Sequence, residues 1–245
     1  MKKFLLFAGV ACAIPFHAPA AAIACGSGTL ASYISLAAGC DVNGQLFAGF
    51  TALPFTPGST TSLSPASITV TPITAGGPGL LFTVNESAGS NQLADAAIGF
   101  TIAPDAGSAN LLAGNTLTQN GGTATGAGNV VGTESICLNS AFTVAGVCPT
   151  NLAARNLGTF ALAGGLAQTT DSLTFAAPRS LIGINANFSA DGGPGGTAAV
   201  TSFAVQVTTA TPAVPEPSTF AALTGGLLGL GLYLRRSNNS LRRIQ

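Results

Sequence analysis

Apolar residues that recur at every second position constrain the fold of this chain most. In the ranges Leu80–Val84 and Ile98–Ile102, an apolar side chain occupies every alternate position. This period is typical of a β-strand with one buried and one solvated face, because successive side chains of a strand point to opposite sides. The same period recurs at Ile68–Val70, Phe160–Leu162, Leu173–Phe175, Ile182–Ile184 and Phe203–Val207.

Turn-forming residues separate these runs. Glycine and proline cluster at Gly76–Gly79, Pro104–Gly107 and Asp191–Gly196, where they favour tight turns. We therefore predict about ten strands between Thr29 and Thr209, in an all-β fold. Short strands joined by such turns are typical of an antiparallel β-sandwich, of the jelly-roll or Ig-like kind. A helix is expected at most as one turn at Leu93–Ala97, and Thr208–Ala213 is expected to be a linker.

The N-terminal residues are predicted to form a secretory signal peptide over residues 1–24. Lys2 and Lys3 precede an apolar stretch, Phe4–Phe16, and the small residues Ala18–Ala24 follow it. This order of charged, apolar and small regions is what signal peptidase recognises. Cleavage after Ala22 or after Ala24 fits equally well. A lipoprotein with Cys25 as the acylated residue is the alternative.

Removal of the targeting segments changes the charge balance. The formal charge of the whole chain is zero, but only Arg155 and Arg179 are basic between the two ends. Seven acidic residues share that region, so the body carries a net charge of −5; they are Asp41, Glu86, Asp95, Asp105, Glu134, Asp171 and Asp191. Nucleic-acid binding requires a basic surface, so nucleic acid is excluded as a partner. The body, residues 25–210, is long enough for one domain with a core.

Four cysteines remain after the signal peptide: Cys25, Cys40, Cys137 and Cys148. An even number of cysteines in an exported domain indicates two disulfides. Three pairings are formally available, and closeness in sequence favours Cys25–Cys40 and Cys137–Cys148. A zinc site is the alternative, but the spacings are not those of zinc ligands and the only histidine, His17, lies in the signal peptide. No metal is expected.

The C-terminal segment, residues 211–245, has the features of a sorting tail. Pro215 and Pro217 hold Glu216 in an extended backbone. Residues 218–234 contain no charge and are predicted to form a membrane helix of about 26 Å. Arg235 and Arg236 open a basic stop that extends to residue 243. The positive-inside rule places this end of the chain in the cytoplasm.

Residues 214–236 closely resemble the PEP-CTERM sorting tail of exopolysaccharide-producing Gram-negative bacteria. In that family a Pro-Glu-Pro motif precedes a short Gly/Leu-rich helix and an arginine cluster, as here. The resemblance implies that exosortase, a membrane-embedded protease, recognises Pro215, Glu216 and Pro217 and cuts near them. It also implies transient anchoring in the inner membrane and then arrival at the cell surface or in the extracellular matrix. An ordinary membrane anchor with a proline hinge is the alternative.

Catalytic residues are scarce in the body. With no histidine, lysine or free cysteine expected there, the usual serine and cysteine hydrolase sites cannot form. Two carboxylates could still form a glycosidase pair, but a sandwich is expected to carry its acids on the solvated face. Calcium could be bound if Asp105 and Asp191 met in space, although solvated turn residues are the favoured interpretation. No enzymatic activity and no cofactor are expected.

The sequence therefore predicts a non-enzymatic protein of the cell surface or exopolysaccharide matrix, sorted through its tail. A carbohydrate-binding module of the same fold is the alternative function, with exopolysaccharide as the partner. Phe47, Phe50 and Phe55 could form an aromatic platform for a sugar, but core packing is the favoured role for them.

Overall fold

The computed structural model describes residues 22–53 and 60–211. Within these ranges the chain forms sixteen strands and one short helix, and ten of the strands are five residues or longer. The chain divides into two compact units, Met1–Ala210 and Thr211–Gln245. The predicted signal peptide lies outside the described residues except for its last three positions, and residues 212–245 lie outside them entirely. Among the described residues, no helix combines the length and the hydropathy needed to cross a membrane.

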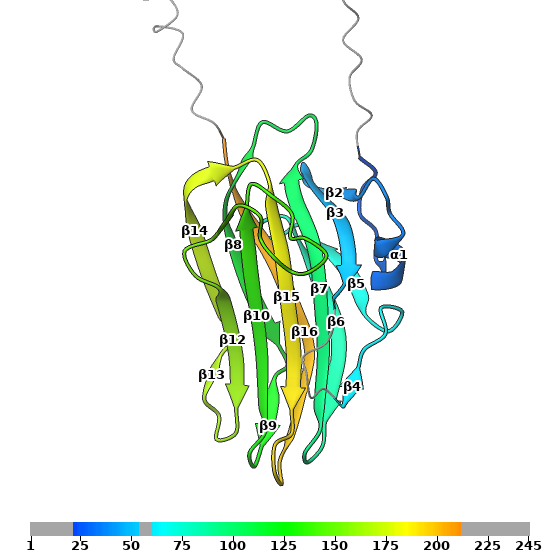
Figure 1. The fold of residues 1–245 in the computed structure, drawn as a ribbon, viewed down its shortest axis with the longest axis vertical. Coiled ribbons are helices and arrows are strands. Elements are labelled where there is room, and N and C mark those ends of the chain that lie inside the picture. Colours follow the sequence, from blue (N-terminus) through cyan, green and yellow to red (C-terminus); the bar gives the residue numbers. More distant parts are fainter. Residues whose placement is uncertain (1–21, 54–59, 212–245) are drawn as a thin grey trace, which may run out of the picture. The chain divides into compact units, whose positions relative to one another are not determined.

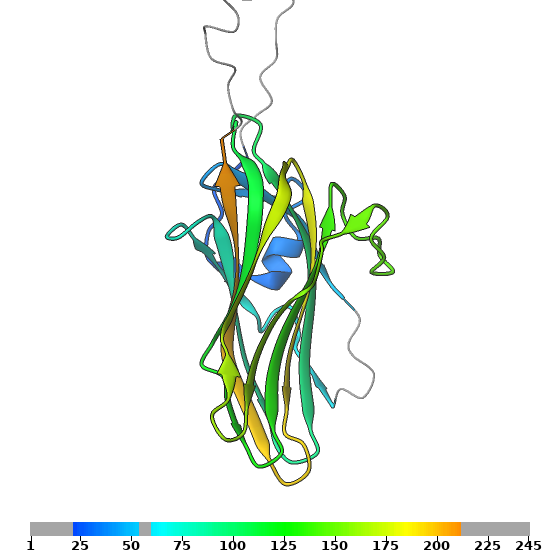
Figure 2. The same ribbon diagram turned by 90° about the vertical axis from the view of Figure 1, so that its left-hand side faces the viewer.

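Two sheets pack face to face and hold the core between them (Figure 1, Figure 2). The seven-stranded sheet has the spatial order β1 (Gly28–Thr29), β5 (Thr69–Ile73), β6 (Gly79–Ala88), β16 (Thr197–Ala210), β8 (Leu111–Asn120) and β14 (Thr170–Arg179), with β9 (Thr123–Thr125) beside β16. The nine-stranded sheet has the order β13 (Ala167–Gln168), β12 (Leu157–Leu162), β10 (Asn129–Leu138), β15 (Ile182–Asp191), β7 (Leu93–Pro104), β3 (Gln45–Ala52) and β2 (Cys40–Val42), with β11 (Asn151–Leu152) beside β10 and β4 (Thr61–Ser62) beside β7. The predicted antiparallel β-sandwich is confirmed, with β4 and β7 as a short parallel pair.

Eight strands follow a nested order in which consecutive members change sheet at every step except from β10 to β12. In chain order they are β6, β7, β8, β10, β12, β14, β15 and β16. Strand β6 pairs with β16, β7 with β15, β8 with β14, and β10 with β12. This nesting is the strand order of a double-sheet jelly roll. Neighbours in space are therefore mostly distant in sequence.

Aromatic rings run through the core from one sheet to the other. Phe188 and Phe203 stack with their centroids 4.2 Å apart, and Phe50 stacks on Phe100 at 5.4 Å. Further ring contacts connect these pairs into a continuous row: Tyr33–Phe50, Phe100–Phe82 and Phe82–Phe188. Such contacts add to the hydrophobic gain of burying each ring. The inward alternate positions of the strands supply this row, as the period-two pattern predicts.

The only helix among the described residues is α1 (Leu30–Ile34). Thr29 begins it, because its hydroxyl accepts a hydrogen bond from the Ser32 backbone N–H at 3.2 Å. The helix buries Leu30 and Tyr33 against the edge of the core. The expected helical turn at Leu93–Ala97 was wrong, since these residues belong to β7. Thr208–Ala210, expected to be linker, instead complete β16.

Glycine turns meet at the end of the sandwich where β15 joins β16. Gly193 and Gly195 have positive φ, at 55° and 72°. A side chain on Gly192 would lie 1.9 Å from the carbonyl oxygen of Gly89, and one on Gly196 would lie 2.3 Å from that of Thr125. Backbones of three separate turns therefore touch directly at this end. The segment is a turn, as predicted.

Candidate functional site

The sequence-predicted site residues divide into two groups. Pro215, Glu216, Pro217, Arg235 and Arg236 lie outside the described residues. The four cysteines are described, and they form two disulfides, Cys25–Cys40 and Cys137–Cys148. This is the pairing that closeness in sequence favours.

The first disulfide fastens the start of the body to the edge of the nine-stranded sheet. Cys25 bonds to Cys40, the first residue of β2, and its backbone N–H donates to the Asp41 carbonyl oxygen at 2.8 Å. The Tyr33 hydroxyl donates to the Gly26 carbonyl oxygen at 2.8 Å. A sulfur atom held in a disulfide cannot also carry the thioether of an acylated cysteine. The structure therefore favours the disulfide role of Cys25 over the lipoprotein alternative.

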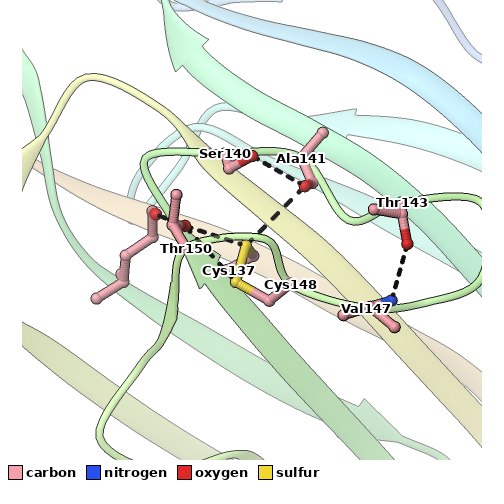
Figure 3. The surroundings of a disulfide bond; sticks show 8 residues. Cys137, Ser140, Ala141, Thr143, Val147, Cys148 and Thr150 are labelled. Carbon is pink, nitrogen blue, oxygen red and sulfur yellow. Dashed lines mark hydrogen bonds between the residues drawn. A yellow bond between two sulfur atoms is a disulfide. The ribbon is translucent and has the colours of Figure 1, made fainter.

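The second disulfide closes a loop that lies over β15 (Figure 3). We call residues 139–150 the disulfide loop. Gly183 of β15 lets the loop approach, because a side chain there would lie 2.7 Å from the Ser140 carbonyl oxygen. The Thr150 hydroxyl donates to the Leu138 carbonyl oxygen at 2.5 Å. At the loop tip, the Val147 backbone N–H donates to the Thr143 hydroxyl at 3.1 Å. The loop is thus fixed at both ends and at its tip.

A groove of about 540 Å³ lies between this loop and the outer face of the nine-stranded sheet. We call it the loop groove. Its floor includes Thr51 after the bend in β3, Gly99 and Thr101 on β7, and Asn185 on β15. Its wall is the loop segment Ala141–Val144. The volume lies within the range of small-molecule sites, about 300–1,000 Å³.

The loop groove is hollow because its floor consists of small side chains. In the sheet register, Gly99 lies opposite both Thr51 and Asn185, and Gly183 lies opposite Thr101. A glycine in a strand leaves room on the outer face at that position. The Thr101 hydroxyl donates to the Ala48 carbonyl oxygen at 3.1 Å. None of the described residues that line the groove is charged, so an uncharged ligand would fit it best.

Asn185 is the polar residue of the groove floor whose side chain remains available. Its neighbours Ile184 and Ala186 point into the core and are fully buried, so Asn185 points outward. Its half-buried amide makes no hydrogen bond to a described residue. A side-chain amide offers two donors and one acceptor oxygen. Sequence analysis did not find Asn185, because an outward asparagine on a strand looks like any solvated residue.

A second hollow lies on the other side of the disulfide loop. Its volume is about 460 Å³, and Ser135, Val147, Thr150 and Leu152 are among the residues that line it. Phe142 and Asn185 line both hollows. The two hollows therefore meet at one aromatic ring and one amide. The spacing of Cys137 and Cys148 around an apolar segment was the only sequence signal for this region.

Three acids are buried, which corrects the expectation that the acids lie on the solvated face. Glu86, Asp95 and Glu134 have at most 2% of their surface exposed. Glu134 points between the sheets, where the Asn115 side chain donates to its Oε1 atom. Its Oε2 atom has no hydrogen-bond partner among the described residues. Burial raises the pKa of Glu134 to about 8, although the hydrogen bond from Asn115 opposes this shift.

Glu86 is a second interior acid without a cation. Neither of its carboxylate oxygens has a hydrogen-bond partner in the described part of the chain. Burial, followed by the negative charge of Asp95, raises the pKa of Glu86 to about 8. Neither Glu86 nor Glu134 lines the loop groove. These acids are therefore features of the core and do not belong to the groove.

Asp171 has the opposite environment, at the edge where β12 and β14 approach each other. The Arg155 guanidinium donates to both Asp171 carboxylate oxygens, at 2.6 and 2.7 Å. The Gly158 backbone N–H donates a third hydrogen bond, at 2.9 Å. The hydrogen bonds from Arg155 contribute most to lowering the pKa of Asp171 to about 2. Charge-assisted bidentate pairs of this kind are the strongest side-chain hydrogen bonds.

The structure does not bring the candidate calcium residues together. Asp105 follows the last residue of β7, whereas Asp191 pairs with Leu93, the first residue of the same strand. The two aspartates thus lie at opposite ends of a 12-residue strand. The Asp191 side chain accepts a hydrogen bond from the Gly193 backbone N–H at 2.8 Å, as a turn residue does. Among the described residues, no three His, Cys, Asp or Glu side chains cluster in a way that could hold a metal ion.

Phe47 and Phe50 do not form the aromatic platform that was considered for sugar binding. Phe47 and Phe50 are buried, at 0% and 4% exposure, and contribute to the aromatic row of the core. This agrees with the favoured role in core packing. Phe55 lies outside the described residues. Phe142 in the disulfide loop is half-buried and lines the loop groove together with Phe100, which belongs to the aromatic row of the core.

Comparisons with known proteins give a family match for the C-terminal tail and only weak structural likenesses for the body. The family model described as "PEP-CTERM protein-sorting motif" matches residues 213–237. No curated protein sequence matches the chain. One similar solved structure is the enzymatically active domain of tailspike protein 4 from bacteriophage CBA120, at 14% identity and a TM-score of 0.25; the match covers 69% of this chain and only 20% of that one. Another is TmCBM61 in complex with β-1,4-galactotriose, at 9% identity and a TM-score of 0.25, with 65% of this chain and 88% of that one covered. Likenesses this weak carry no argument about the function of the body.

Proposed function

From the PEP-CTERM protein-sorting motif that this chain carries at residues 213–237, we propose that the protein is an exosortase substrate that is exported and then released to the cell surface or extracellular matrix. The observation that carries this proposal is the match itself, which contains Pro215, Glu216, Pro217 and the Arg235–Arg236 pair. The motif implies export and sorting at the membrane. In the proposed topology, residues 218–234 cross the inner membrane and Arg235 and Arg236 stay in the cytoplasm.

The body has properties that suit an exported protein. Its two disulfides persist in an oxidising compartment outside the cytoplasm. We propose that the body is a structural or adhesive component of the exopolysaccharide matrix and has no enzymatic activity. The composition of the loop groove supports this, because its lining among the described residues contains no acid, base or cysteine. General acid–base catalysis would require such a group within reach of the substrate.

The sorting proposal is tested by the substitution Glu216→Ala in a full chain with a C-terminal tag. We expect the tag to remain attached to the body and the amount of protein at the surface to fall, because the protease loses its recognition residue. Ser240→Ala is the matched control, since Ser240 lies in the tail but outside the matched residues. Immunoblotting of membrane and surface fractions measures both quantities. Unchanged processing in the Glu216→Ala variant would show that the tail is an ordinary anchor.

Carbohydrate binding is the second function that we propose. A specific observation favours it: among the described residues, the lining of the loop groove is uncharged, includes the Phe142 ring and presents the Asn185 amide without a hydrogen-bond partner. Glycan-array binding by the full chain tests this function. An array without signal for any neutral glycan would leave the protein as a structural matrix component, and the sorting proposal would be unaffected.

A further inference from the structure

We propose that the loop groove and the second hollow together form one binding site for an elongated, uncharged polysaccharide chain, with Phe142 and Asn185 at its centre. The inference rests on the carbohydrate-binding function proposed above and names its site and ligand class. The two hollows have volumes of about 540 and 460 Å³ and share these two residues. A ligand that passes from one hollow to the other must therefore contact both the ring and the amide.

The charges of the site favour a neutral ligand. Within the part of the chain that the structure describes, no Asp, Glu, Lys or Arg lines either hollow, so no side chain there compensates a charged group. A buried charge without a partner is strongly unfavourable. Uronic-acid polymers and phosphorylated ligands are therefore poor occupants.

The polar groups of the site favour a ligand rich in hydroxyl groups. Under a purely apolar ligand, the Asn185 amide would lose its contact with water and gain no partner, which is unfavourable. A sugar hydroxyl can donate to the amide oxygen and accept from the amide nitrogen. The Phe142 ring offers an apolar surface for the C–H face of a pyranose. Together these groups match both faces of a sugar residue.

The strand pairing argues against a peptide ligand. Peptides commonly bind by extending a sheet at a free edge. Of the strands in the floor, β7 and β15 are paired on both sides, whereas β3 beyond Phe47 is paired only with β7. Extension of the sheet is therefore blocked at β7 and β15, which carry Gly99 and Asn185, and a peptide bound there would have to rely on side-chain contacts.

The disulfide loop keeps the site open. The Cys137–Cys148 bond closes the loop, and the Asn139 backbone N–H donates to the Leu181 carbonyl oxygen at 2.9 Å. The contact between Ser140 and Gly183 then sets the height of the loop above β15. Phe142 is consequently held in place before a ligand arrives, which lowers the entropic cost of binding.

The experiment is calorimetric titration of the full chain, held in a nanodisc, with cellohexaose, laminarihexaose and xylohexaose. Polyguluronate serves as the charged probe. We expect at least one neutral oligosaccharide to bind with a Kd of about 1 mM or tighter, and polyguluronate not to bind. Asn185→Ala and Phe142→Ala should each weaken binding at least about tenfold.

Two controls match these variants in chemistry and differ in position. Asn156→Ala removes an exposed asparagine, and Leu166→Ala removes an apolar side chain that is 63% exposed; neither residue lines the hollows. Both should bind as the unmodified chain does. Gly99→Val fills the groove floor and should therefore abolish binding. The variant should still fold, because the nearest atoms to the added side chain belong to the ends of the Thr51 and Leu53 side chains and not to the backbone. Circular dichroism verifies that each variant is folded.

The outcomes separate the site from the function. If a sugar binds the unmodified chain and the Asn185, Phe142 and Gly99 variants equally, carbohydrate binding holds and the proposed site is wrong. If no neutral oligosaccharide binds, the site and the carbohydrate function both fail. Binding of polyguluronate alone would overturn the charge argument. Processing of the tail is a separate readout and does not depend on any of these results.

Discussion

Asp171 at the edge of the sandwich and Glu134 in its interior show how differently one fold treats a carboxylate. Asp171 receives two hydrogen bonds from Arg155, and its pKa falls to about 2. Glu134 receives one side-chain hydrogen bond from Asn115, has no cation beside it, and has a pKa of about 8. The difference teaches that a carboxylate paired with a cation stays ionised at the edge, whereas burial without a cation favours the protonated form of Glu134.

The two environments should give opposite dependences of stability on pH. Glu86 and Glu134 have folded-state pKa values of about 8, above the value of 4.5 for a free side chain. Over this interval the folded chain holds protons that the unfolded chain has lost. The free energy of unfolding therefore falls as the pH rises from about 4.5 to about 8, and it is constant above that range. Asp171 acts in the other direction, since its stabilisation is present above about pH 4 and is lost as the pH falls toward its folded pKa of about 2.

The largest expected effect is on the stability profile of the unmodified chain. Urea unfolding followed by circular dichroism should show a maximum near about pH 4.5 and a loss of about 3–6 kcal/mol by about pH 8. Proteins more commonly reach their maximal stability between about pH 5 and pH 8. A profile that is flat between these two values would contradict the assignment of protonated acids to the core.

A smaller effect should follow from Glu134→Gln. The glutamine keeps an acceptor oxygen for the Asn115 side chain but cannot ionise. We expect the free energy of unfolding to rise by about 2–3 kcal/mol at about pH 8 and to stay unchanged at about pH 4.5. Asp105→Asn is the control, because it removes the same charge from a residue that is not buried. Equal stabilisation by the two variants would mean that net charge, and not burial, is responsible.

The smallest effect should come from the pair at the edge. A double-mutant cycle with Arg155→Ala and Asp171→Asn should give a small favourable coupling free energy at neutral pH. The value is modest because the Arg155 side chain is 49% exposed. It should decrease in about 1 M salt, which screens exposed charges. The same cycle with Asp105→Asn in place of Asp171→Asn should give no coupling; a similar value there would assign the effect to long-range charge.

Part of this architecture could be predicted from the sequence. The period of two residues located the strands, because alternate burial leaves a direct trace in the order of residues. The same alternation also indicated that Glu86 is buried, because Glu86 occupies an alternate position between the inward residues Val84 and Ala88. The general preference of acids for solvent led to the wrong expectation there. Glu134 gave a weaker signal, because Gly132 interrupts the apolar alternation of β10.

Helix α1 and the loop groove could not be predicted from the sequence. Helix α1 has only five residues, too few to establish a period of 3.6. The loop groove combines β3, β7, β15 and the disulfide loop, which lie as much as 136 positions apart if measured from Gly49 to Asn185. The nested strand order that brings them together is a property of the whole fold. No local pattern in the sequence could therefore predict the groove.

The position of β16 has a consequence for when the body can fold. This strand ends at Ala210, yet it lies in the middle of its sheet, between β6 and β8. The sheet cannot close until the last strand has been exported, and the sorting tail follows it within a few residues. Pairing between the first and last of the eight nested strands makes folding slow, because most contacts join distant parts of the chain. On the proposed export route, membrane insertion of the tail and completion of the sandwich should thus be nearly simultaneous, which leaves the unfinished body exposed to aggregation until that moment.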